Sequence, residues 1–136
     1  MEVRICIDVD DMPRAIAFYT EGLGLQVGRR LDSQWVEIIG AGSTIDLLFN
    51  AAGTQPVKGS PAVRSYERHW TPVHLDFVVD DMEAAVARLL AHGGTLEAPV
   101  AERPYGRIAR LRDPFGHGLD LLEFKGRGYD EMLQPG

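Results

Sequence analysis

The chain has 136 residues, of which 45% are hydrophobic and 25% charged, and its formal net charge is −6. This is the composition of one globular domain with enough apolar material for a core. The acidic balance disfavours a nucleic-acid partner, which needs clustered Lys and Arg, and no apolar run has the length of a membrane span. Cys6 is the one cysteine. No disulfide can form within the chain, so we expect a cytoplasmic protein with a small buried side chain at this position.

The first part of the chain, residues 3–50, shows a strand pattern, a helix pattern and three more strand patterns. Apolar residues alternate from Val3 to Val9, which predicts a strand. They then recur at helical spacing from Met12 to Tyr19, which predicts a helix ending before Gly22. Three further strands are expected over residues 25–31, 34–39 and 45–48.

Residues 51–72 read as a connector, because this segment is rich in glycine and proline and shows no periodicity. The order of the first part then returns in residues 73–124. A strand is expected from Val73 to Val79, a helix from Met82 to the glycines at 93–94, and strands over 95–100, 106–112 and 119–122. The last residues, 125–136, contain three glycines and few apolar residues, which predicts a loose tail or an arm that contacts a partner.

Two motifs confirm that the second part repeats the first within a single domain. The run Val9-Asp10-Asp11-Met12 recurs as Val79-Asp80-Asp81-Met82, and Ile45-Asp46-Leu47-Leu48 recurs as Leu119-Asp120-Leu121-Leu122. The paired aspartates precede helices, where carboxylates accept bonds from the free N–H groups of the first turn, so we assign all four to capping. Asp80 with Glu83 has the spacing of a capping box.

Each repeat therefore reads as a βαβββ module, and the chain as an α+β fold of two such modules. A single module has one apolar sheet face and too few residues to cover it, so the two are expected to pack together.

Side-chain parity brings polar residues together on the first strand of each module. Residues two apart on a strand share a face, so Arg4 and Asp8 share one, and His74 and Asp76 share another. Burying these groups without partners would cost several kcal/mol each. We therefore expect them to face a wet cavity, each other or a metal ion.

The order of motifs resembles the vicinal-oxygen-chelate superfamily, which includes glyoxalases, bleomycin-resistance proteins and extradiol dioxygenases. The resemblance covers Val3 to about Phe124. It depends on two runs, Val9-Asp10-Asp11-Met12-Pro13-Arg14-Ala15-Ile16-Ala17-Phe18-Tyr19 with Gly22-Leu23-Gly24-Leu25, and Asp113-Pro114-Phe115-Gly116-His117-Gly118-Leu119-Asp120. It implies that the modules form a curved, mixed-sheet cup that binds a small molecule, closed within one chain or between two. It also implies a homodimer.

Family enzymes hold a divalent metal with residues of the first and last strand of each module. Carried over to this sequence, the positions are Arg4, Asp46, His74 and Asp120. The resemblance thus implies that His74, Asp120 and Asp46 would bind Fe, Mn, Zn or Ni, as a lyase, isomerase or dioxygenase acting on vicinal oxygens. Asp46 and Asp120 are then the candidate catalytic carboxylates. Substrate contacts are expected from Arg4, Asp76, Trp70 and Tyr105.

Arg4 supports an alternative, because the family usually has His at this position and a guanidinium has no lone pair for a metal. It could instead pair with Asp46 or Asp120 and leave a metal-free cup that binds an antibiotic, as bleomycin-resistance proteins do. Arg4 also argues against a glyoxalase acting on a glutathione adduct. Of the remaining histidines, His69 is expected in a solvated loop, His92 at a helix end and His117 at an exposed turn.

Overall fold

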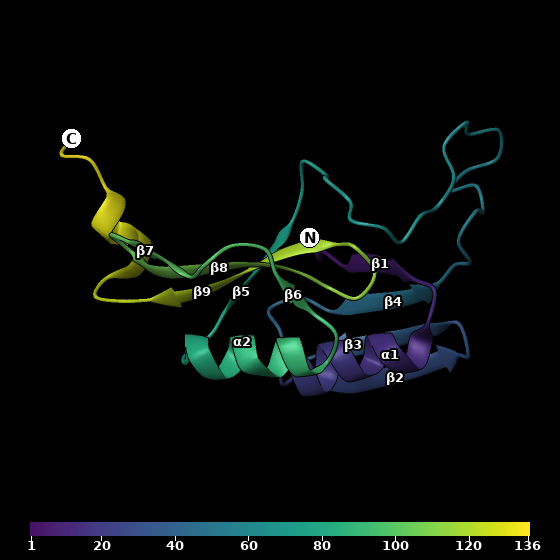
Figure 1. The fold of residues 1–136 in the computed structure, drawn as a ribbon, viewed down its shortest axis with the longest axis horizontal. Coiled ribbons are helices and arrows are strands. Elements are labelled where there is room, and N and C mark those ends of the chain that lie inside the picture. Colours follow the sequence, from purple (N-terminus) through teal and green to yellow (C-terminus); the bar gives the residue numbers. More distant parts are fainter.

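The computed structural model describes all residues, 1–136, as an α+β fold with two mixed sheets (Figure 1). The first sheet has the order β1-β4-β3-β2, and its strands are β1 (Ile5–Val9), β2 (Gln26–Asp32), β3 (Trp35–Ile39) and β4 (Ile45–Phe49). The second has the order β5-β9-β8-β6, with β7 also paired to β8. Its strands are β5 (Leu75–Val78), β6 (Thr95–Leu96), β7 (Ala101–Arg103), β8 (Gly106–Arg112) and β9 (Gly118–Phe124).

In each sheet the first and last strands of the module are parallel neighbours, because a helix carries the chain away between them. α1 (Met12–Ala17) continues as a π-helix, η1 (Phe18–Gly22), and α2 (Met82–Ala91) is the helix of the second module. Figure 1 shows α1 and α2 along one side of the molecule and the connector on the opposite side. A short 3-10 helix, η2 (Gly128–Met132), ends the chain, so the predicted loose tail is partly ordered.

The aspartate pairs cap the helices with one member each. Asp11 accepts a bond from the N–H of Arg14 and Asp81 from the N–H of Ala84, both at 3.0 Å. Asp10 and Asp80 make no such bond, so the capping box expected of Asp80 and Glu83 does not form, because the N-cap is Asp81 and the residue three positions later is Ala84. The N-cap position needs extended backbone, and it is Asp11 and Asp81 that adopt it, with φ of −147° and −137°.

Of the predicted strand over 95–100 only the first two residues form a strand, β6, and β7 follows beyond its predicted end. Pro99 lies between them and has no N–H to give to a ladder, which is the physical reason for the break. The other strands agree with the patterns to within two residues at most ends. No helix is long and apolar enough to cross a bilayer.

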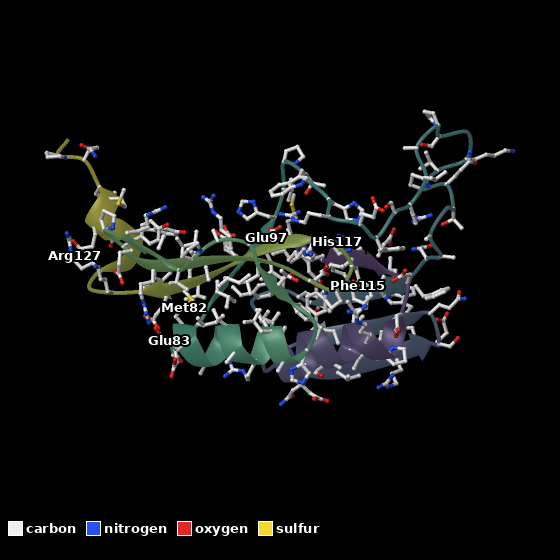
Figure 2. All side chains as sticks on the ribbon, in the orientation of Figure 1. Met82, Glu83, Glu97, Phe115, His117 and Arg127 are labelled. Atoms are coloured by element: carbon white, nitrogen blue, oxygen red, sulfur yellow. The ribbon has the colours of Figure 1, made fainter.

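One hydrophobic core joins the two modules. Phe18 and Tyr19, at the end of the first helix, lie in the same buried cluster as Leu89 of α2 and Phe115 of the β8–β9 turn. In Figure 2 Phe115 lies near the middle of the molecule, where the modules meet. The helices pack closely enough that a Cβ at Gly22 would be 3.0 Å from the Leu89 side chain, so this glycine serves packing as well as helix termination.

A candidate cation and ligand site on the second sheet

His74, Asp76 and Asp120 form a compact cluster on the open face of the second sheet. Asp76 in β5 is the register partner of Asp120 in β9, and His74 directly precedes β5. The His74 Nε2 is 3.2 Å from Asp76 Oδ1 and 3.4 Å from Asp120 Oδ2. One donor atom from each residue lies within 4.8 Å of the others. The parity argument thus placed the polar face of β5 correctly.

The electrostatics of the cluster favour a positive charge. Burial raises the pKa of Asp120 above its ordinary value, and the negative charge of Asp76 raises it further, while His74 and Arg110 act in the opposite direction. Two carboxylates facing each other across a parallel strand pair repel, and a cation between them would relieve the repulsion.

The cluster opens into a hollow between the sheet and the end of the connector. Trp70 and Arg68 come from the connector, and Arg110 comes from β8. The full lining is Arg68, His69, Trp70, Thr71, His74, Arg110, Gly118, Leu119 and Asp120. Trp70 was expected to contact substrate, and the structure brings it to the same hollow as His74.

The equivalent face of the first sheet is closed by an ion-pair network. Arg4 donates to both oxygens of Asp46, at 3.0 and 2.8 Å, and to Glu37 at 2.5 Å. Arg29 donates to Glu37 as well, and the Trp35 indole donates to Asp46 at 2.9 Å. Arg29 is the main cause that lowers the pKa of Glu37 to about 2, with burial opposing and Arg4 assisting.

Asp46 is therefore not part of the cluster around His74, although the sequence placed it among the ligands. Its side chain is 2% exposed and its oxygens are taken by Arg4 and Trp35. Burial alone would raise the pKa of Asp46, but the bonds from Arg4 and Trp35 lower it overall. Within one chain the structure joins His74 and Asp120 with Asp76 rather than with Asp46.

Tyr105 does not line the hollow. Its ring lies 5.0 Å from Tyr129 and 6.4 Å from Phe124, in an aromatic group at the far end of β9. Tyr129 belongs to the expected tail and was not singled out from the sequence. Burial raises the pKa of its phenol, and the charges of Asp76, Tyr105 and Asp120 act in the same direction.

Three further expectations concern residues near the module junction. Cys6 is exposed on the open face of β1, not buried. His117 is half-buried rather than exposed, since its Nε2 is 2.8 Å from the Asp8 carbonyl oxygen and its ring stacks on His69 at 5.1 Å. Figure 2 shows His117 near the middle of the molecule. His92 ends α2 as expected and also pairs with Glu21 at 2.9 Å.

The two halves of the inferred ligand set differ in how well they fit a metal. On the second sheet, an imidazole and two carboxylates form a donor set that suits Fe, Mn, Zn or Ni. On the first sheet, Arg4 cannot donate a lone pair and neutralises the one carboxylate next to it. A four-ligand centre therefore does not fit these residues, whereas a three-residue site on the second sheet does.

Comparisons with known proteins agree with this architecture. A family model described as a glyoxalase-like domain matches residues 4–122. A lactoylglutathione lyase from Salmonella typhimurium is 29% identical over 131 residues, covering 88% of this chain and 90% of that protein. The anthracycline biosynthesis protein DnrV from Streptomyces peucetius is 40% identical over 78 residues, covering 57% of this chain. This chain spans about a quarter of the length of DnrV and of its relative DauV.

Among solved structures, the fosfomycin resistance protein FosX from Listeria monocytogenes aligns with a TM-score of 0.71 and 20% identity, over 98% of both chains. A glyoxalase/bleomycin resistance protein from Albidiferax ferrireducens aligns with a TM-score of 0.66 and 23% identity, over 90% of this chain and 97% of that one. These two similarities concern the fold. Together with the family model, which covers most of the sequence, they establish that the chain belongs to the glyoxalase-like domain family of the vicinal-oxygen-chelate superfamily.

Proposed function

We propose that the chain is an enzyme of lyase or dioxygenase type that binds a divalent metal through His74, Asp76 and Asp120. Its substrate is a small molecule with two adjacent oxygens. The observation that carries the proposal is the approach of one imidazole and two carboxylates to within 4.8 Å, beside a hollow. The similarity to a lactoylglutathione lyase over most of both chains supports an enzymatic role.

The three residues of the cluster would have two roles, metal binding and proton transfer. A metal bound there would polarise the substrate oxygens as a Lewis acid. His74 and Asp76, on the more exposed side of the cluster, hold the cation. Asp120 completes the set and is also the candidate base, because its carboxylate lines the hollow in which the substrate would lie.

Metal titration of chelator-treated protein tests this assignment. We expect at least one of Mn²⁺, Fe²⁺, Zn²⁺ and Ni²⁺ to bind in calorimetry with a stoichiometry near one. His74→Ala and Asp120→Asn should each weaken it by at least the roughly tenfold to hundredfold cost of losing a supporting residue. Asp80→Asn is the matched control, since Asp80 is an exposed carboxylate outside the hollow.

The outcome for Asp46 separates the two ligand sets. Asp46→Asn should keep the metal affinity of the wild type, because Arg4 already holds both oxygens. A large loss in this variant would instead support Asp46 as a ligand and catalytic carboxylate, as the sequence led us to expect. The absence of binding for all four ions, or equal affinity in the wild type and His74→Ala, would contradict the proposal.

A metal-free binding protein of the bleomycin-resistance type is the second candidate, and the locked Arg4–Asp46 pair favours it. In that case Asp76 and Asp120 would bind a cationic group of the ligand directly. The partial similarity to an anthracycline biosynthesis protein suggests a cationic anthracycline as the probe. Tight binding of this probe to metal-free protein, lost in Asp120→Asn, would support this candidate over the first.

A further inference from the structure

A second cavity, of about 240 Å³, lies next to the hollow and has three arginines in its wall. They are Arg14 from α1, Arg68 from the connector and Arg112 at the end of β8. Arg68 is the one residue that lines both spaces, so its side chain stands between this arginine cavity and the hollow that holds His74. Three guanidiniums around one space, in a chain of net charge −6, indicate an anionic occupant.

The register of the second sheet places two of the guanidiniums on one face. Arg112 in β8 is the partner of Gly118 in β9, and the side chains of register partners point to the same face. A Cβ added at Gly118 would be 2.6 Å from the Arg68 Nη2, so Arg68 takes the place that a side chain at this position would have. Thr95 of β6 is the partner of Arg112 on the other side and adds a hydroxyl to the wall.

Arg14 reaches the same cavity from the first module. A Cβ added at Gly93 would be 3.3 Å from the Arg14 Nη2 and 3.2 Å from the Pro114 side chain, so the guanidinium lies against the end of α2 and close to the β8–β9 turn. Gly93 has a φ of 94°, a conformation that favours glycine, and the missing side chain leaves room for the guanidinium. The cavity therefore joins the two modules.

Two of the three arginines have all their donors free. Arg68 is paired with Glu97 through both carboxylate oxygens, at 2.8 and 2.9 Å. The guanidiniums of Arg14 and Arg112 make no hydrogen bond and no ion pair within the chain. Both therefore remain available to an anion from solution.

The carboxylates in the wall do not neutralise these two arginines. Asp113 is 2% exposed, and its oxygens accept from the Tyr19 hydroxyl and from the N–H groups of Phe115 and His117. Its charge is thus bound within the turn and the core. Glu67 is exposed, and its side chain makes no ion pair.

From this geometry we infer that the arginine cavity binds a phosphate group, either free or carried by a phosphomonoester, between Arg14 and Arg112. A planar carboxylate is satisfied by one guanidinium, as Glu97 is by Arg68. A tetrahedral dianion has oxygens in several directions, so it can accept from guanidiniums on different elements and from the Thr95 hydroxyl. The inference does not depend on the proposed function, because the phosphate site and the metal cluster share no residue.

Titration of orthophosphate in calorimetry tests the site. The protein is treated with chelator, so that phosphate cannot bind through a metal in the hollow. Methyl phosphate is the monoester probe, and acetate is the comparison ligand with a single charge and a planar shape. Arg14→Gln and Arg112→Gln each remove one free guanidinium. Arg30→Gln is the matched control, because Arg30 is an exposed arginine of β2 outside the cavity and without an ion pair.

We expect saturable binding of orthophosphate by the wild type in the millimolar range or tighter. Arg14→Gln and Arg112→Gln should each bind it about tenfold or more weakly, the range for loss of hydrogen bonds between charged groups. Arg14→Lys, which keeps the charge but not the planar fork, should lie between the wild type and Arg14→Gln. Arg30→Gln and His74→Ala should bind as the wild type does. Methyl phosphate binding as tight as that of orthophosphate would identify an ester as the ligand, and binding of orthophosphate alone would identify free phosphate.

The absence of saturable phosphate binding at millimolar concentration would overturn the inference. So would an unchanged affinity in Arg14→Gln or in a folded Arg112→Gln. Arg14 is exposed at the surface of α1, so Arg14→Gln keeps the test decisive if Arg112→Gln disturbs β8. A loss in Arg30→Gln as large as in Arg14→Gln, or acetate binding as tight as phosphate binding, would also contradict a phosphate site. None of these results affects the proposed function, which is tested by metal binding in His74→Ala.

Discussion

Arg4 occupies a position at which the family resemblance implies a metal ligand, and its guanidinium instead bonds both oxygens of Asp46. A guanidinium remains protonated and offers donors only, so this substitution turns a ligand position into an ion pair. Glu37 then becomes the carboxylate between two guanidiniums, because Arg29 reaches it from β2. The sequence indicated the partner of Arg4 correctly as one of two aspartates, but gave no sign of Glu37.

The ion-pair network around Glu37 should make the free energy of unfolding depend on pH in the acidic range. The pKa of Glu37 is lowered in the folded protein to about 2, against an ordinary value of 4.5. The folded state therefore favours the ionised form. Its contribution is fully present above about pH 4.5 and is lost as the pH falls towards about 2. We expect Glu37→Gln to show a shallower loss of stability than the wild type across this window.

Urea unfolding at a series of pH values measures this difference. Glu67→Gln is the control, because Glu67 is an exposed glutamate whose side chain makes no hydrogen bond or ion pair. Parallel stability curves for the wild type and Glu37→Gln between pH 4.5 and 2 would show that Glu37 does not carry the effect.

At the scale of elements, the repeat around the two helices offers an internal comparison. Each helix is preceded by two aspartates, and in both cases the second one accepts the bond from the first turn. We expect Asp11→Ala and Asp81→Ala each to reduce the free energy of unfolding by about 1 kcal/mol, the usual cost of losing an N-cap. Asp10→Ala and Asp80→Ala should cost clearly less, because they remove a nearby negative charge but no hydrogen bond.

Thermal and urea unfolding of the four variants give the measurement. The paired design removes the general effect of losing a negative charge near a helix start, because that effect is shared by both members of each pair. Equal losses for Asp10→Ala and Asp11→Ala would mean that the charge, and not the hydrogen bond, stabilises the helix.

At the scale of the whole molecule, a buried hydrogen bond ties the two modules together. The Tyr19 hydroxyl, at the end of the first helix, donates to Asp113 Oδ2 in the β8–β9 turn at 2.7 Å, and both residues are 2% exposed. Burial raises the pKa of Tyr19 well above its ordinary value, and the charge of Asp113 adds to this, so the phenol remains a donor at neutral pH.

Tyr19→Phe should therefore cost about 1–3 kcal/mol of unfolding free energy, since it leaves a buried carboxylate short of one donor. Tyr105→Phe is the control, because no hydrogen bond of the Tyr105 hydroxyl is present. Chemical denaturation of both variants measures the loss of unfolding free energy in each. A loss in Tyr19→Phe no larger than in Tyr105→Phe would contradict a stabilising role for this contact.

The expected homodimer also belongs to this scale. β1 and β5 are edge strands of their sheets, so each has an unpaired side. We predict that light scattering will give a mass of twice the 15.0 kDa of the chain. A monomer at micromolar concentration would show that the hollow has to function within one chain.

The sequence by itself determined the βαβββ order, the strand parity and the position of the helix starts. These features depend on local periodicity, which is visible in a few consecutive residues such as Val9 to Met12 and their repeat. It also placed Asp76 and Asp120 on strands that carry a polar face, and His74 directly before one of them. The break at Pro99 could have been expected from the missing N–H.

Tertiary structure decided which of these polar residues meet. Asp46 and Asp120 have the same place in the repeat, yet one is neutralised by Arg4 and the other faces Asp76 and His74. Trp70 lines the same hollow as His74 and Asp120 only because the fold brings the end of the connector to the second sheet. Such contacts join segments far apart in the chain, and a pattern read over neighbouring residues has no information about them.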